Sequence, residues 1–201
     1  MAVNIDEMIN NLLEFYSFDN KTIISVGAGG GQFIEYGRRS KRVIAIDNSL
    51  PALTALEKAL QSKCLTDKFT LIHSDFYQTD VKGDVVLFEF CLHEMEDSIR
   101  AIDHALTMAP CVVVSDHWPE SEWAYIADER EKVIHSWGGL ERFTFQKIQR
   151  YDTHHYFLDY QELLMKVKVQ GETSIRRIES YRGRINITIP MSYGFAMIKR
   201  S

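Results

Sequence analysis

Short apolar runs rich in β-branched residues alternate with segments of helical spacing over the first half of this 201-residue chain. Each run is too short for a helix and ends at a turn or capping residue, which is typical of a buried β-strand. Because strands joined through helices pair in parallel, the alternation predicts an α/β fold: a mostly parallel sheet with helices on both faces. The expected strands cover residues 22–26, 42–46, 69–73, 84–90 and 111–114.

The pattern changes after the fifth expected strand. Residues 119–137 have helical spacing, a further helix is expected over 157–168, and strands are expected over 174–181 and 193–199. This late pair of strands predicts an antiparallel edge of the sheet. We therefore expect one domain over 1–201, with an N-terminal helix within 1–20 and a helical lid inserted over 117–155.

The composition excludes several classes of protein. The 23 Lys and Arg against 28 Asp and Glu give a formal charge of −5, which does not supply the field for non-specific nucleic-acid binding. The longest apolar stretch is too short to span a membrane, and the first residues lack the pattern of a secretory signal. Three widely spaced cysteines form no disulfide framework. We expect a cytoplasmic protein without nucleic-acid or membrane partners.

A glycine-rich loop follows the first expected strand, with Gly27, Gly29 and Gly31 at alternate positions. Glycine allows a sharp turn and a close approach of the backbone to a ligand. A short helix expected near residues 32–37 would turn its free N–H groups toward an anion. The simpler alternative is a tight strand-to-helix turn without a ligand.

Acidic residues follow the second and third expected strands. Asp47 lies twenty residues beyond Gly27, where a carboxylate can accept hydrogen bonds from both hydroxyls of a ribose. Asp75 precedes Phe76, and a carboxylate beside a flat ring suits the amino group and the face of an adenine. Each acid alone could instead cap a helix. Because parallel strands end at one edge of the sheet, the three positions together predict one elongated ligand site.

The spacing of the glycines separates two kinds of nucleotide ligand. The dinucleotide fingerprint needs glycine or alanine three positions after Gly29, where this chain has Gln32. The order of the glycine loop and the two acids instead resembles the class I S-adenosylmethionine-dependent methyltransferases, over roughly residues 20–116. This resemblance implies a Rossmann-like sheet of seven strands with an antiparallel last strand. It also implies S-adenosylmethionine as cofactor.

The resemblance implies roles for individual residues. The glycines would line the methionine end of the cofactor, Asp47 would bind the ribose, and Asp75 with Phe76 would bind the adenine. One departure is Ser25, which stands where the family's first motif opens with an acid. The expected cofactor-binding residues are Gly27, Gly29, Gly31, Asp47, Asn48, Asp75, Phe76 and Glu89.

The segment after the fourth expected strand, residues 89–97, resembles that of family members acting on small molecules. It differs from the proline-rich motif of the members that methylate amino groups of nucleic acids. His93, Glu94 and His117 are the candidate catalytic residues, because they follow the fourth and fifth strands and could face the methyl group. A base among them is needed only if the acceptor must lose a proton.

A magnesium site is the alternative interpretation of the same edge. Glu89, Asp116 and His117 resemble in position the magnesium ligands of catechol O-methyltransferases. Magnesium prefers oxygen ligands, so a histidine at this place argues against it. No metal is expected.

Aromatic residues are concentrated in one segment. Residues 117–160 hold ten of the 23 aromatic residues and all three tryptophans. We interpret this density as an apolar lid that excludes water from the methyl donor. It favours a small acceptor that is aromatic or apolar. The alternative is a helical subdomain that uses these rings for its own core.

Two other functions remain open at this point. One is an NAD-dependent oxidoreductase on a similar sheet, which Gln32 disfavours. The other is a non-catalytic subunit that binds S-adenosylmethionine or S-adenosylhomocysteine without turnover, which the missing acid at Ser25 allows. The sequence carries no signal for the oligomeric state.

Overall fold

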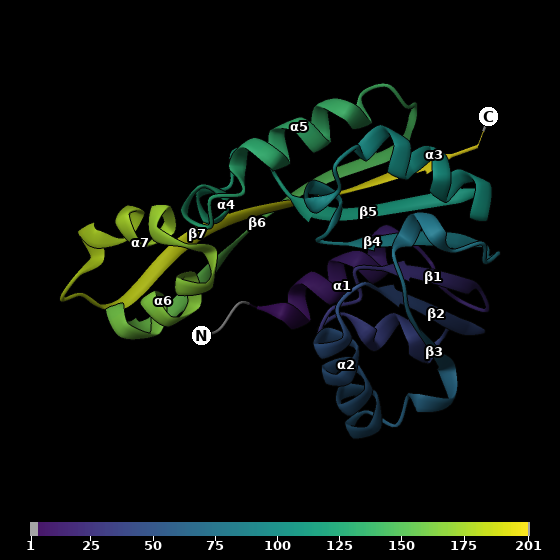
Figure 1. Ribbon diagram of the computed structural model, residues 1–201, viewed down its shortest axis with the longest axis horizontal. Helices are drawn as coiled ribbons and strands as arrows, with labels where there is room; N and C mark the ends of the chain where they lie inside the picture. Colours follow the sequence, from purple (N-terminus) through teal and green to yellow (C-terminus); the bar gives the residue numbers. More distant parts are fainter. Residues whose placement is uncertain (1–3, 201) are drawn as a thin grey trace.

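The computed structural model describes residues 4–200 and contains one seven-stranded sheet in the order β3-β2-β1-β4-β5-β7-β6 (Figure 1). Strands β1 to β5 are parallel, and β7 is antiparallel to both of its neighbours. The predicted fold class is therefore confirmed. The strands are β1 (Thr22–Val26), β2 (Arg42–Asp47), β3 (Phe69–His73), β4 (Val85–Glu89), β5 (Cys111–His117), β6 (Phe145–Asp159) and β7 (Ile185–Lys199).

Helices cover both faces of the sheet. Apolar side chains of α3 and α5 pack on one face, and those of α1 and α4 pack on the other. Helix α2 packs over the β2 and β3 edge. The helices are α1 (Ile5–Phe15), α2 (Leu50–Ser62), α3 (Ser98–Met108), α4 (Glu122–Ile126), α5 (Arg130–Leu140), α6 (Tyr160–Val167) and α7 (Glu172–Arg177).

The order of the strands fixes where a ligand can bind. The chain passes from β1 to β2 on one side and returns to β4 on the other side of β1. The connections that leave β1 and β4 therefore diverge, and a crevice opens beyond the carboxyl ends of these strands. Both the glycine loop and the segment after β4 lie at this crevice.

The short helix expected near residues 32–37 after the glycine loop is present, but as a 3₁₀ helix and not as an α-helix. The chain forms only a short 3₁₀ helix, η1 (Ile34–Arg38), between β1 and β2. A single turn of this kind has a small dipole and few aligned N–H groups. An anion site at a helix N-terminus, which the sequence suggested here, is therefore not formed.

The second half of the chain also differs from expectation. The helix expected over 119–137 is broken into α4 and α5 at Asp128, whose φ of 64° is left-handed. The helical lid expected over 117–155 ends at α5, because Phe145–Asp159 is a strand whose exposed and buried side chains largely alternate. The strand expected over 174–181 is instead α7 and a short 3₁₀ helix, η6 (Glu179–Tyr181).

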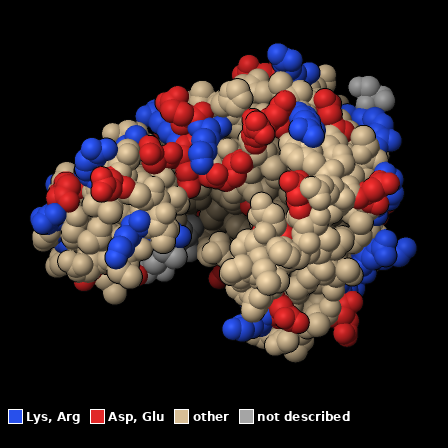
Figure 2. All heavy atoms as spheres, viewed as in Figure 1, with Lys and Arg blue, Asp and Glu red and all other residues tan. Residues whose placement is uncertain are grey.

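Strands β6 and β7 form a long antiparallel ladder that extends beyond the parallel strands. Figure 1 shows the far ends of this ladder running toward α6 and α7, which form a lobe beside the main body. Figure 2 shows a hollow between this lobe and the body, with acidic and basic side chains interspersed on the face in view. Among residues 4–200, no helix combines the length and the apolar character needed to cross a membrane.

Candidate functional site

A cleft of about 690 Å³ lies at the carboxyl ends of β1, β2 and β3. Five of the residues expected to bind a cofactor line it together: Gly27, Asp47, Asn48, Asp75 and Phe76. The structure thus brings together positions that are separated by up to 49 residues in the chain. One strand end supplies each group, as the parallel topology requires.

Asp47 fixes the shape of this cleft. Its Oδ2 accepts a hydrogen bond from the backbone N–H of Gly29 (3.1 Å), and its Oδ1 accepts one from the N–H of Ser49 (2.8 Å). The carboxylate therefore joins the glycine loop to the start of α2. A carboxylate has about four lone-pair sites, so the side chain keeps acceptor capacity for a ligand hydroxyl.

Two glycines of the loop are required for different reasons. Gly27 has a φ of 68°, and a Cβ atom there would lie 2.5 Å from Cys91 Sγ. Gly31 has a φ of 79°, and its Cβ would lie 2.9 Å from Leu56 Cδ1 of α2. Gly27 therefore permits contact with the segment after β4, whereas Gly31 permits close packing of α2. The expected role of Gly31 beside a ligand does not follow from this geometry.

The Asp75 end of the cleft differs in detail from expectation. Asp75 Oδ1 accepts a hydrogen bond from the N–H of Tyr77 (2.7 Å), so the side chain caps a short turn while remaining exposed. The ring of Phe76 is 5% exposed and packs against Phe88 and His104, with centroids 5.4 and 4.8 Å away. Little of that ring is open for stacking on a ligand.

A second cavity, of about 300 Å³, lies on the other side of the glycine loop and includes Gly27, Gly29 and Glu89 in its lining. Glu89 accepts hydrogen bonds from the hydroxyls of Ser25 and Tyr36. Burial raises the pKa of Glu89 to about 7. The neighbouring strand β4 therefore supplies a carboxylate directly against Ser25.

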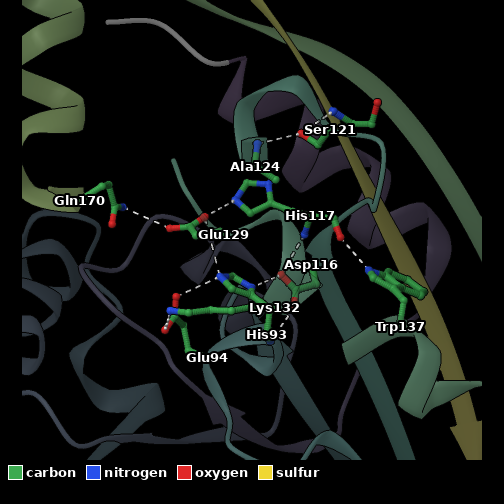
Figure 3. A network of polar contacts seen from close by, with 11 residues as sticks. His93, Glu94, Asp116, His117, Ser121, Ala124, Glu129, Lys132, Trp137 and Gln170 are labelled. Atoms are coloured by element: carbon green, nitrogen blue, oxygen red, sulfur yellow. Dashed lines mark hydrogen bonds and ion pairs between the residues drawn. The ribbon is translucent and has the colours of Figure 1, made fainter. Parts of the chain in front are cut away.

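The candidate catalytic residues after β4 belong to a partly buried polar network (Figure 3). His93 Nδ1 lies 2.6 Å from Asp116 Oδ1, and the His93 backbone N–H donates to Asp116 Oδ2 (3.0 Å). Burial opposes a charge on His93, but its bonds to Asp116 and Glu94 prevail and raise its pKa to about 10. Contacts with His93 and Lys132 lower the pKa of Glu94 to about 2. Burial raises the pKa of Glu129, which also faces His93.

His117 lies between this network and a third cavity, of about 210 Å³. The cavity is lined mainly by apolar side chains, and His155 and Lys166 also reach it. Burial lowers the pKa of His117 to about 4 and that of His155 to about 3. This cavity shares Phe33 and Phe90 with the cavity at the glycine loop, so the two are adjacent.

The aromatic segment only partly forms a lid. Trp123 lines the third cavity and stacks on His155, with ring centroids 4.1 Å apart. Trp118 and Trp137 instead pack on each other (4.6 Å), and Trp137 Nε1 donates to the carbonyl of His117 (2.6 Å). Trp118 and Trp137 therefore serve the packing around α5 and do not cover the cavity.

The comparison with protein families identifies the domain that carries this geometry. Residues 24–108, from β1 to the end of α3, match the family model of a methyltransferase domain. Over this part of the sequence the chain is similar to a methyltransferase domain. A search of curated proteins finds no significant match to its sequence.

Solved structures share the fold of this chain at low sequence identity. The YcgJ protein of Bacillus subtilis superposes with a TM-score of 0.73, at 11% identity, over 98% of this chain and 99% of that chain. The [4+2]-cyclase SpnF has a TM-score of 0.66 at 14% identity, over 97% and 81%. A protein of Pyrococcus horikoshii described as an RNA methyltransferase has a TM-score of 0.59 at 12% identity, over 98% and 82%.

Several residues of the domain's site were not predicted from the sequence. Glu129 and Gln170 join the polar network, and Trp123 and His155 line the third cavity. Neither Glu129 nor Gln170 follows a strand of the parallel sheet, so their positions gave no signal. The burial of His155 and the exposure of His154 follow from the alternation of side chains along β6.

Proposed function

We propose that this protein binds S-adenosylmethionine in the cleft at the ends of β1 to β3 and transfers its methyl group. Asp75, with the cleft edge at Phe76, would bind the adenine, and Asp47 with Asn48 would bind the ribose. The observation that carries the proposal is the joint presence of the glycine loop and both acids in one cleft. The match to a methyltransferase domain supports the same cofactor.

We further propose that Glu89 binds the ammonium group of the methionine part. The cavity at the glycine loop is lined by Glu89 together with Gly27 and Gly29. A buried carboxylate stabilises a neighbouring ammonium group, because the two opposite charges attract each other strongly where little water is present. Glu89 would therefore do what the acid missing at Ser25 does elsewhere in the family.

The third cavity is the proposed binding site of the acceptor. Its apolar lining and its volume of about 210 Å³ suit a small aromatic or apolar molecule. Of the three candidate catalytic residues, His117 lines this cavity, so we propose that it contacts the acceptor. His93 and Glu94 would position the surrounding groups.

Methyl transfer requires mainly the correct placement of two molecules. The acceptor atom forms a bond to the methyl carbon while the carbon–sulfur bond breaks, and the positive sulfonium becomes a neutral thioether. In-line alignment and exclusion of water account for much of the rate in reactions of this kind. Adjacent donor and acceptor cavities provide that alignment.

The first test is ligand binding. We expect S-adenosylhomocysteine at about a hundred times its dissociation constant to stabilise the protein by about 2.7 kcal/mol, read as a rise in Tm. NAD(H) serves as the control ligand. Stabilisation by NAD(H) alone would favour an oxidoreductase instead.

Turnover needs a separate measurement, because the same fold also carries a cyclase. Incubation with methyl-labelled donor and fractionated metabolites should yield a labelled small molecule. Label in added RNA would contradict a small-molecule acceptor. The expectation of no nucleic-acid partner rests on the net charge and on the absence of the proline-rich motif after the fourth strand. Donor binding without any labelled product would favour the non-catalytic subunit.

Donor binding should also depend on pH through Glu89. The hydroxyls of Ser25 and Tyr36 donate to this carboxylate, and the charge of Asp47 adds to the burial that keeps its pKa near 7. Binding of an ammonium group requires the ionised form, so Glu89 must release its proton. We expect the affinity for S-adenosylhomocysteine to rise about tenfold from pH 6 to pH 7.5.

Calorimetric titration in two buffers of different ionisation enthalpy would measure this proton release. Glu89→Gln should bind the ligand more weakly at pH 7.5 and with no pH dependence in this range. Asp75→Asn, the matched control, should keep the wild-type slope. An equal slope in Glu89→Gln would contradict the assignment of the ammonium group.

A further inference from the structure

Two histidines and two glutamates meet between the donor cleft and the third cavity, and we refer to them as the His/Glu cluster. Its members are His93, Glu94, His117 and Glu129. One ligand atom each of His93, Glu94 and Glu129 lies within 4.8 Å of the others. His117 Nε2 lies 3.8 Å from Glu129 Oε2, the same oxygen that faces His93. Figure 3 shows both rings turned to the Glu129 carboxylate.

Groups outside the His/Glu cluster hold three of its members in place. In each case the outer group forms a hydrogen bond or an ion pair with one nitrogen or oxygen of the side chain. The second nitrogen or oxygen of that side chain then faces the other members of the cluster. These outer partners are Asp116 for His93 Nδ1 (2.6 Å), Lys132 for Glu94 Oε2 (2.8 Å) and Gln170 for Glu129 Oε1 (3.1 Å). A carboxylate that orients the far nitrogen of a histidine is the usual support of a metal ligand.

The distances inside the cluster are longer than those of charge-assisted hydrogen bonds. His93 Nε2 lies 3.4 Å from Glu94 Oε1 and 3.8 Å from Glu129 Oε2. A charge-assisted hydrogen bond would be about 2.7–2.9 Å long. Ligands of a tetrahedral ion with bonds of about 2.0–2.1 Å lie about 3.3 Å apart, so the ligand atoms of His93, Glu94 and Glu129, within 4.8 Å of one another, would have to move closer on binding an ion.

The charges and the burial of the residues in this network also favour a bound cation. The network holds three carboxylates, Glu94, Glu129 and Asp116, against two cations, the Lys132 ammonium and the protonated ring of His93. His117 is 8% exposed, and its Nδ1 has no hydrogen-bond partner within residues 4–200. Asp116 is buried, Glu129 is partly buried and Glu94 is exposed. The carboxylates still outnumber the cations of the network, and a divalent ion would balance this excess.

We propose that the His/Glu cluster binds one divalent transition-metal ion, such as Zn²⁺. The ligand atoms would be Nε2 of both histidines and one carboxylate oxygen of each glutamate. Two imidazoles and two carboxylates suit zinc, manganese or iron, whereas calcium and magnesium favour oxygen ligands alone. This ligand set differs from the magnesium site considered from the sequence, which used Glu89 and Asp116.

The position of the ion would connect the two halves of the proposed reaction. Glu94 also lines the donor cleft, and His117 also lines the third cavity. An oxygen of the acceptor could therefore bind as a fifth ligand of the ion, next to the donor. This last role rests on the proposed function, whereas metal binding itself does not.

The test is Zn²⁺ binding by the full chain. The protein is first stripped of metal with EDTA, the EDTA is removed, and Zn²⁺ is then added. We expect the wild type to retain about one Zn²⁺ per chain after gel filtration, and to give the visible absorption of protein-bound Co²⁺ in a parallel titration. Glu129→Gln and His93→Gln should retain less than a tenth of this amount. Asp116→Asn should weaken Zn²⁺ binding about 10- to 100-fold, because it removes the outer support of His93.

Matched controls separate the site from general surface binding. Glu131→Gln lies on the exposed side of α5, and His154→Gln lies on the exposed face of β6, so both should retain wild-type zinc. Gln170→Ala changes an exposed residue and should fold normally, yet weaken zinc binding several-fold. The proposal would be overturned if the wild type retained no zinc, or if Glu129→Gln retained as much zinc as the wild type. Binding of S-adenosylhomocysteine in EDTA tests the donor site independently.

Discussion

Asp47→Ala is expected to abolish most of the binding of S-adenosylhomocysteine. The variant loses the two charge-assisted hydrogen bonds proposed for the ribose hydroxyls, each of about 1.5–3 kcal/mol. It also removes the acceptor that holds the N–H of Gly29 at 3.1 Å, so the glycine loop loses its support. Together these losses correspond to at least a hundredfold weaker binding, since about 1.4 kcal/mol is a factor of ten. Titration calorimetry and the ligand-induced rise in Tm both measure it.

Two further variants show whether the loss of binding in Asp47→Ala comes from the missing carboxylate of Asp47. Asp47→Asn keeps an acceptor oxygen for the loop and should bind with an intermediate affinity. Asp67→Ala changes an exposed acid outside the cleft and should bind as the wild type does. An unchanged rise in Tm for Asp47→Ala would exclude the ribose assignment.

Gly27→Ala is expected to destabilise the protein strongly and to distort the donor cleft. The left-handed φ of 68° costs about 1–3 kcal/mol for a residue with a side chain. The added Cβ would lie 2.5 Å from Cys91 Sγ, and overpacking of this kind costs about 1–3 kcal/mol. We expect a loss of about 2–5 kcal/mol and a fall in Tm of about 5–15 °C, measured by thermal unfolding.

A matched glycine lies in α5, where a Cβ at Gly138 would meet nothing within 4 Å. Gly138→Ala should raise stability by about 0.5–1 kcal/mol through helix propensity. The double variant Gly27→Ala/Cys91→Gly removes the Cys91 atoms that the new Cβ would meet. It should recover the stability lost to this steric clash, but not the stability lost to the left-handed φ of residue 27. A normal Tm for Gly27→Ala would show that the loop adopts another conformation.

The first half of the fold could be predicted because local patterns decide it. Strands β1 to β5 are short, continuous apolar runs, and a parallel sheet buries such runs on both faces. Asp47 and Asp75 could be placed in one cleft for the same reason, since each follows a strand directly. The spacing of residues is sufficient to predict the strands and the site residues where the sheet has a regular parallel topology.

The second half could not be predicted in the same way. Helical spacing continues through residues 119–137, yet the chain breaks at Asp128, which takes a left-handed conformation. Strand β6 was missed because its exposed side chains include Ile148, Tyr156 and Leu158, which obscure the alternation. Pairing with β7 along the whole ladder stabilises it in spite of that pattern.

The amino-acid sequence by itself determined the parallel strands, the glycine loop and the acids at the strand ends, because each depends on neighbouring residues and on one regular topology. Only the tertiary structure decided that Glu89 lies against Ser25 and that Glu129 lies between His93 and His117. These contacts join residues that are 12 to 64 positions apart in the sequence and belong to different packed elements. Their formation depends on the register of β1 and β4 and on the turn before α5, which no local pattern specifies.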